Sequence, residues 1–162
     1  MRVGIGYDVH RFAPDRRLVL GGVEIPHSVG LLGHSDADVL LHAIADAILG
    51  AAALGDIGLH FPPSDPAYRD ANSLELLAES LRLVAEAGYR VGNVDATIIA
   101  EAPRVLPHAP EMRVLISEAL RIEVADVSIK ATTNEGMGFV GREEGIAALA
   151  IAILIPISAS RN

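Results

Sequence analysis

The stretch SDADVLLHAIADAILG, at residues 35–50, decides the fold class of this chain. From Val39 onward its apolar residues recur at helical spacing, and Ser35 is a suitable N-cap for the helix. Gly50 or Gly55 stands where such a helix ends. The stretch therefore predicts a helix, whereas the residues on either side of it have the period of strands.

Strand patterns flank this helix, and two further helices follow it. The predicted strands lie at residues 3–8, 18–20, 23–25, 91–99 and 127–131. The predicted helices run from Asn72 or Ser73 to Ala87 and from Pro110 to about Arg121. Because helices and strands interleave, we expect an α/β or α+β fold: one domain over residues 1–162, with a mixed β-sheet packed by about three helices.

A last strand is predicted in the C-terminal run. Apolar residues alternate there with a face of small ones, formed by Ala148, Ala150 and Ala152. Such a face permits close packing of the backbone. We expect a helix of the same chain to cover it in preference to a neighbouring subunit, which the sequence leaves open.

The composition is that of a globular chain and excludes several classes of function. Hydrophobic residues make up 51% of the chain and charged residues 21%, which excludes a disordered protein. The net charge of −8 argues against broad binding of nucleic acid. There is no cysteine for disulfides or thiolate metal sites. We find no signal-peptide core, and the most apolar run, Ile146 to Ile157, is too short to cross a membrane, so we expect a cytoplasmic protein with no membrane partner.

One set of residues is suited to a metal ion. Asp8 and His10 lie two apart on a predicted strand, so both side chains can point to the same face, and His42 lies on the first helix. If these elements meet, two imidazoles and a carboxylate surround a divalent ion with one open position. Asp38 or Asp46 could then accept the other ring N–H of His42. The alternative, a turn aspartate with two ordinary histidines, is favoured by these residues taken alone.

Other segments are suited to phosphates. His34 precedes the first helix, whose N-terminal amides favour an anion, although the segment is equally suited to capping alone. Ser128, Lys130 and Thr132 share one face of their strand and lead to Glu135, a set that could bind a diphosphate and its Mg²⁺.

Two loops are predicted near these segments. The proline-rich residues 55–66 read as an irregular loop, either for substrate or as a linker. The glycines of residues 136–141 match G-x-G-x-x-G, but a strand-like run follows them and no acidic residue occurs after Glu144. We therefore reject a dinucleotide site there and expect a flexible loop.

Taken in order, these motifs closely resemble the family of 2-C-methyl-D-erythritol 2,4-cyclodiphosphate synthases, enzymes of the non-mevalonate isoprenoid pathway. The resemblance covers nearly the whole chain. The matching segments are DVH at 8–10, GHSD at 33–36, LHA at 41–43, GAAALGDIG at 50–58, NVDATIIA at 93–100 and KATT at 130–133, with Glu135.

The resemblance implies a homotrimer whose active sites lie at the subunit boundaries, where one chain supplies a metal and the next a cytidine pocket. Zn²⁺ would be bound by Asp8, His10 and His42. Glu135 would hold a Mg²⁺ or Mn²⁺ that bridges the substrate phosphates. His34 and Thr133 would stabilise the transition state.

The resemblance also implies the substrate contacts. Around the methylerythritol phosphate they are His34, Ser35, Asp56, Ile57, Gly58 and the loop from Phe61 to Asp65, with Asp8 and His10 beside them. Around the cytidine diphosphate they are the segment Ala100 to Leu106, which includes Pro103 and Arg104, together with Ala131, Thr132 and Thr133. Phe139 and Arg142 would lie near the substrate or the trimer axis.

The implied reaction is an intramolecular cyclisation. The 2-phosphate of 4-diphosphocytidyl-2-C-methyl-D-erythritol 2-phosphate attacks the β-phosphorus, closes an eight-membered ring and expels CMP. Because a phosphate is already ionised at neutral pH, the enzyme's main tasks are positioning and charge neutralisation. A metal-dependent phosphohydrolase and a non-catalytic nucleotide-binding trimer stay open as alternatives.

Two departures from the family pattern stand out. Many relatives carry aspartate where this chain has Pro63, so we expect only the backbone to serve for a contact to the erythritol hydroxyls there. Ile5 and Leu149 are apolar where some relatives carry polar residues, so we expect an apolar channel along the trimer axis.

Overall fold

A mixed sheet organises the chain, as a computed structural model shows for residues 1–62, 64–68 and 70–157. Its strands stand in the order β4-β1-β7-β5-β6. Their bounds are β1 Arg2–Ala13, β4 Gly30–Leu31, β5 Tyr89–Ile99, β6 Val127–Thr132 and β7 Gly145–Pro156. β5 and β6 run parallel, and the other neighbouring pairs are antiparallel, which confirms the predicted mixed sheet. β2 (Leu18–Leu20) and β3 (Val23–Ile25) form a separate two-stranded sheet.

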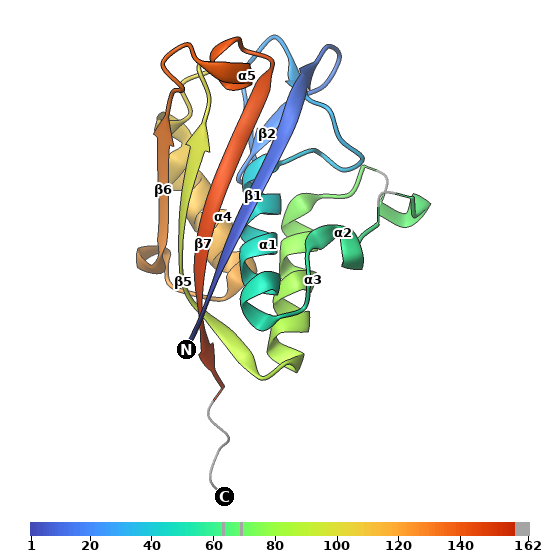
Figure 1. Cartoon of the computed structure of the whole chain (residues 1–162), viewed down its shortest axis with the longest axis vertical. Coiled ribbons are helices and arrows are strands. Elements are labelled where there is room, and N and C mark those ends of the chain that lie inside the picture. The colour runs from blue at the N-terminus through green and yellow to red at the C-terminus, as the bar shows by residue number, and fades with distance from the viewer. Residues whose placement is uncertain (63, 69, 158–162) are drawn as a thin grey trace, which may run out of the picture.

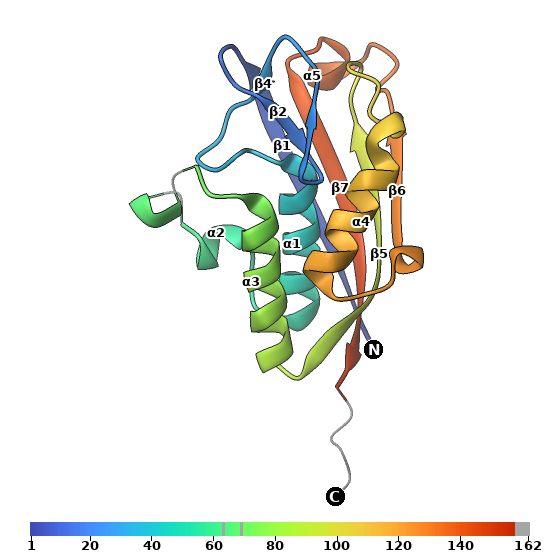
Figure 2. The same cartoon turned by 180° about the vertical axis from the view of Figure 1, so that it is seen from behind.

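Three long helices cover one face of the sheet (Figure 2). They are α1 (Val39–Ala52), α3 (Ser73–Glu86) and α4 (Ala109–Leu120), and all three are predicted by the sequence. Between them lie the short helices α2 (Ile57–His60) and α5 (Gly138–Gly141) and the 3-10 turns η1 (Pro66–Tyr68), η2 (Leu106–His108) and η3 (Val124–Asp126). The described part of the chain is therefore a single α+β domain with five α-helices.

The other face of the sheet is left open by the described helices (Figure 1). Apolar side chains of β1 stand on it, with Val3 64%, Ile5 65% and Tyr7 52% exposed. Ile151 of β7 lies beside them in register with Ile5. No described helix is both long and apolar enough to cross a bilayer.

Helix α1 lies directly against the sheet because small residues face it. Ala148, Ala150 and Ala152 of β7 are fully buried, which confirms that a helix of the same chain covers the alanine face. On β1, a Cβ built on Gly4 would stand 2.0 Å from the Ala47 carbonyl oxygen, and one built on Gly6 would stand 1.9 Å from that of Ala43. Only glycine permits this approach, which brings the first turn of α1 alongside residues 8–10.

The predicted N-cap of α1 is wrong, because Asp38 caps the helix in place of Ser35. Asp38 Oδ1 accepts a hydrogen bond from the Leu41 amide at 3.1 Å. Its other oxygen accepts from the Gly22 amide at 2.7 Å, which ties the β2–β3 hairpin to the helix. Asp38 therefore accepts hydrogen bonds from two separate elements, the helix α1 and the β2–β3 hairpin.

Two segments predicted as irregular contain helical turns. Residues 55–66 include α2, whose N-cap Asp56 accepts from the Leu59 amide at 2.9 Å. Residues 136–141 include α5, a single turn, and the strand β7 follows as predicted. In each segment, a short helical turn provides hydrogen-bond acceptors for backbone amides, and the sequence pattern does not show this turn.

Candidate metal centre and substrate pockets

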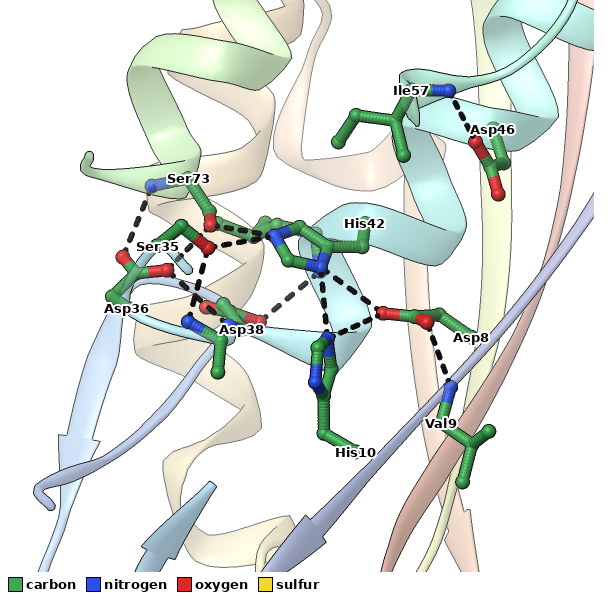
Figure 3. A network of polar contacts seen from close by, with 12 residues as sticks. Asp8, Val9, His10, Ser35, Asp36, Asp38, His42, Asp46, Ile57 and Ser73 are labelled. Atoms are coloured by element: carbon green, nitrogen blue, oxygen red, sulfur yellow. Dashed lines mark hydrogen bonds and ion pairs between the residues drawn. The ribbon is translucent and has the colours of Figure 1, made fainter. Parts of the chain in front are cut away.

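Asp8, His10 and His42 meet at the junction of β1 and α1 (Figure 3). Asp8 and His10 alternate with exposed residues on β1 and point to the helix-covered side, as predicted. Asp8 Oδ2 lies 3.0 Å from His10 Nε2 and 3.0 Å from His42 Nδ1. The two ring nitrogens are 3.2 Å apart. The three atoms thus form a nearly equilateral triangle.

Hydrogen bonds around the triangle indicate which nitrogen of each ring carries a proton. His10 Nδ1 lies 2.7 Å from the Leu32 carbonyl oxygen, which can only accept, so this nitrogen donates and Nε2 presents its lone pair. His42 Nε2 lies 3.0 Å from Ser73 Oγ, and Ser73 Oγ lies 2.5 Å from Asp36 Oδ1. Because the Ser73 proton goes to Asp36, the serine oxygen accepts from His42 Nε2, and Nδ1 presents its lone pair.

The prediction that Asp38 or Asp46 accepts the other ring N–H of His42 is wrong, because neither carboxylate is hydrogen-bonded to that ring. Asp38 is occupied by the two amides described above, and Asp46 Oδ1 accepts from the Ile57 amide at 2.8 Å. Instead, the Ser73 hydroxyl oxygen accepts the hydrogen bond from His42 Nε2, and Ser35 Oγ lies 3.2 Å from the same ring nitrogen. Ser73 lies 31 residues from His42 and shows no local pattern that points to the ring.

The electrostatics of the triangle favour a positive charge. Burial by itself raises the pKa of Asp8, but once the nitrogens of His10 and His42 that face it also bind a proton, their hydrogen bonds and charge outweigh burial and hold that pKa well below its usual range. Burial lowers the pKa of His10, but the hydrogen bond and negative charge of Asp8 outweigh it and raise that pKa. Each shift reflects an attraction for a cation at this point.

The donor set fits a divalent metal ion. A tetrahedral zinc ion with ligands at 2.0–2.2 Å separates its ligand atoms by about 3.3–3.6 Å, a few tenths of an ångström more than the 3.0–3.2 Å sides of the triangle. Three lone pairs converge on the same point, since the other nitrogen of each ring carries the proton. The three residues therefore form a candidate metal site with a fourth position open toward a pocket.

This pocket, which we call the triad pocket, has a volume of about 230 Å³. Besides the triad it is lined by residues that the resemblance implies for the methylerythritol phosphate: His34, Ser35, Ile57, Gly58 and Phe61. Tyr68 and Leu76 also line this pocket and are not predicted by the sequence. Tyr68 lies in a turn and Leu76 is a buried residue of a helix, and neither setting indicates a binding site. Asp56 and Asp65 are outside this lining and cap short turns, and Pro63 lies outside the described residues.

Side chains of the preceding segment cap several of the amides at the start of α1, where a phosphate site is expected. The helix begins at Val39, five residues after His34. The amides of Ala37, Asp38 and Leu41 already donate to the side chains of Ser35, Asp36 and Asp38. The segment from residue 35 therefore acts as a cap, while the His34 side chain lines the triad pocket.

A second and larger pocket, of about 800 Å³, lies where β5 and β6 end. We call it the β5–β6 pocket. It brings together the two segments implied around the cytidine diphosphate, and adds Pro107. Its lining consists of Ala100, Glu101, Pro103, Arg104, Val105, Leu106, Pro107, Ala131, Thr132 and Thr133.

The remaining candidate residues lie around these pockets. Thr133 Oγ1 donates to Glu135 Oε1 at 3.2 Å beside the β5–β6 pocket. Lys130 shares an exposed face with Ser128 and Thr132, as predicted, but its ammonium pairs with Asp95 at 2.5 Å. The hydrogen bond and charge of Lys130 lower the pKa of Asp95. Phe139 and Arg142 line neither pocket, and Arg142 pairs with Glu144 at 2.6 Å.

The comparisons with known proteins agree over the length of the chain. Residues 1–155 match the model of the YgbB family. A curated protein of Syntrophomonas wolfei named 2-C-methyl-D-erythritol 2,4-cyclodiphosphate synthase is 63% identical over 154 residues, or 95% of this chain and 98% of that protein.

Two solved structures show the same fold. IspF of Plasmodium falciparum, in a complex with CDP, is 36% identical with a TM-score of 0.84, and the match covers 97% of each chain. The bifunctional IspDF of Campylobacter jejuni is 42% identical with a TM-score of 0.91, and the match covers 94% of this chain and 42% of that longer one.

Proposed function

This chain belongs to the YgbB family of 2-C-methyl-D-erythritol 2,4-cyclodiphosphate synthases, and we propose how its residues carry out that family's reaction. The enzyme is a cyclising lyase of isoprenoid biosynthesis. It converts 4-diphosphocytidyl-2-C-methyl-D-erythritol 2-phosphate to the 2,4-cyclodiphosphate. An oxygen of the 2-phosphate forms a bond to the β-phosphorus, the bond from that phosphorus to the bridging oxygen breaks, and CMP leaves.

The chemistry requires little from side chains beyond position and charge. The attacking phosphate is ionised at neutral pH, so no nucleophilic side chain has to be deprotonated. What must be supplied is neutralisation of several negative oxygens, in a chain whose own net charge is −8. The triad pocket and the β5–β6 pocket divide this task between the two ends of the substrate.

We assign the triad pocket to the methylerythritol phosphate. Asp8, His10 and His42 would hold Zn²⁺, which is suited to one carboxylate and two imidazoles. When bound, the ion supplies positive charge against the phosphate oxygens. His34 and Ser35 would donate to the same phosphate, while Ile57, Gly58 and Phe61 would close the pocket around the carbon chain. Asp56 caps the turn that carries Ile57 and Gly58, and Asp65 holds the turn that carries Tyr68, which also lines the pocket.

We assign the β5–β6 pocket to the cytidine diphosphate. Its volume of about 800 Å³ accommodates a nucleotide, and the loop from Ala100 to Leu106 would surround the base. Thr132 and Thr133 lie at the end of β6, where the diphosphate would run toward Glu135. Glu135 would hold Mg²⁺ or Mn²⁺, which prefer oxygen ligands, and Thr133 would donate to the transition state with His34.

We further propose that the enzyme works as a homotrimer. Within one chain β1 and β6 are separated by β7 and β5, so these two strands lie about 14 Å apart across the sheet, and the two pockets share no lining residue. Both ends of one substrate would meet if the β5–β6 pocket of a neighbouring subunit approached the triad pocket. The open apolar face of the sheet, with Ile5 and Ile151 in register, is a suitable contact surface and would line an apolar axis. The turn α5, which contains Phe139 and is followed by Arg142, lies at one end of the sheet (Figure 1).

The observation that carries this function is the convergence of three lone pairs in a pocket lined by the predicted substrate residues. To test it, the purified protein is incubated with the diphosphocytidyl substrate, Zn²⁺ and Mg²⁺, and the products are followed by ³¹P nuclear magnetic resonance. Cyclic diphosphate with an equal amount of CMP is expected. Linear phosphate products would assign a phosphohydrolase, and tight CDP binding without turnover would assign a non-catalytic trimer.

A further inference from the structure

Glu101 joins the two loops that meet in the β5–β6 pocket. It follows β5 and lines the pocket. Its Oε1 atom accepts hydrogen bonds from the backbone amides of Asn134 at 2.8 Å and Gly136 at 3.3 Å. These two amides stand on either side of Glu135. The carboxylate therefore holds the backbone of the residue that we assign to the divalent cation.

The turn that Glu101 holds is unusual for its sequence. The Met137 amide donates to the Asn134 carbonyl oxygen at 2.9 Å, which closes a four-residue turn. Its two central residues both have positive φ, 53° at Glu135 and 73° at Gly136, as in a type I′ turn. Glycine adopts this conformation readily, but a residue with a long side chain does so at a cost in free energy. Glu135 therefore needs outside support to stay there.

We propose that Glu101 is a positioning residue that fixes Glu135 in this left-handed conformation. This inference rests on the proposed function of Glu135. A carboxylate that accepts two backbone amides makes strong, charge-assisted bonds, and the concavity between such amides is a natural anion site. Because Glu101 occupies it, the diphosphate is excluded from these amides. The Glu135 side chain is thereby directed to the neighbourhood of Thr133, whose hydroxyl it already contacts.

The choice of variants separates position from charge. Glu101→Ala removes the acceptor for both amides. Glu101→Gln keeps a carbonyl oxygen that can accept from them but has no negative charge. Glu118→Ala removes an exposed carboxylate on α4, outside the lining of both pockets, and serves as the matched control.

Two measurements test the role. With the diphosphocytidyl substrate, we expect Glu101→Ala to lower kcat about tenfold to hundredfold, with a much smaller change in KM, because a displaced group costs mainly transition-state stabilisation. In the free protein, amide hydrogen exchange at Asn134 and Gly136 should become at least about tenfold faster, since each amide loses its acceptor. Glu101→Gln should restore most of both values, and Glu118→Ala should change neither.

Some outcomes would overturn the inference. If exchange at Asn134 and Gly136 is the same in Glu101→Ala as in the wild type, Glu101 does not hold the turn. If exchange rises while kcat stays unchanged, the turn does not position Glu135 for the reaction. A wild-type protein without cyclising activity would instead contradict the proposed function, and the exchange experiment would still report on the turn.

Discussion

The Ser73 hydroxyl donates a hydrogen bond to Asp36 at 2.5 Å. Its oxygen is therefore left to accept from His42 Nε2 at 3.0 Å, which fixes the orientation of that ring. The same carboxylate accepts from the Ser73 amide at 3.0 Å through its other oxygen, so the serine is held at both ends. The start of α3 thus determines which nitrogen of a histidine on α1 faces the metal site. Outer partners of this kind orient the ligand and set its basicity.

We expect Ser73→Ala to weaken zinc binding about tenfold, because His42 then loses the partner that selects its tautomer. The affinity is measured by competition with a chromogenic chelator. Ser80→Ala is the matched control, since Ser80 is also buried on α3 but donates to the Leu76 carbonyl oxygen of its own helix. Equal zinc affinity for Ser73→Ala and the wild type would contradict the tautomer argument.

The close approach of α1 to β1 makes a second prediction, at Gly6. A methyl group there would meet the Ala43 carbonyl oxygen at 1.9 Å, so Gly6→Ala has to push the helix away from the strand. We expect unfolding to become easier by about 2 kcal/mol or more in urea, measured with a chelator present. Zinc affinity should fall as well, because His42 moves with the helix.

Gly50→Ala provides the contrast within the same helix. A Cβ at Gly50 meets nothing within 4 Å, so the change removes only the flexibility of glycine in a helix. We expect this variant to be more stable than the wild type by about 0.5–1 kcal/mol. If Gly6→Ala and Gly50→Ala had similar stabilities, close packing would not determine where α1 lies.

What could be predicted from the sequence is what local patterns determine. The helical spacing of apolar residues in Val39–Ala52 and the alternation of larger apolar residues with alanines in β7 are local patterns, so the sequence predicts both elements. The cap of α1 is not, because Ser35, Asp36 and Asp38 all suit a helix start. Asp38 is selected by the Gly22 amide, which comes from a distant hairpin. The partner of His42 is missed for the same reason, since Ser73 reaches it only through the tertiary packing of α3 on α1.

Asp38 also predicts how stability depends on pH. Burial raises the pKa of Asp38 to about 6 from an ordinary 3.8, with the charge of Asp36 acting in the same direction and hydrogen bonds from backbone amides opposing it. A carboxyl with a higher pKa in the folded chain stabilises the fold when protonated. Its contribution is complete below about pH 3.8 and is lost as the pH rises through about 6.

Asp38→Asn keeps a carbonyl acceptor for the cap but cannot ionise. Relative to the wild type, the variant should therefore gain about 2 kcal/mol of unfolding free energy as the pH rises from 4 to 7. The measurement is urea unfolding at several pH values with a chelator present. Asp126→Asn, at an exposed position in η3, is the control for replacing a carboxylate by an amide. A constant difference for Asp38→Asn would show that burial does not perturb this carboxyl.

The open face of the sheet gives the last prediction. Ile5 is 65% exposed in the single chain, and a charge there is tolerated by an isolated subunit but not within an apolar contact between subunits. If the proposed trimer is correct, light scattering should give the wild type three times the mass of one chain, and Ile5→Asp should give single chains. Such chains should still bind zinc, because the triad lies within one subunit, yet they should lose cyclisation because the two pockets no longer face each other.

Val114→Asp changes an equally apolar residue, 41% exposed on α4, and should remain a trimer with full activity. A wild-type enzyme that is fully active as a single chain would show that one subunit brings both ends of the substrate together without a neighbour.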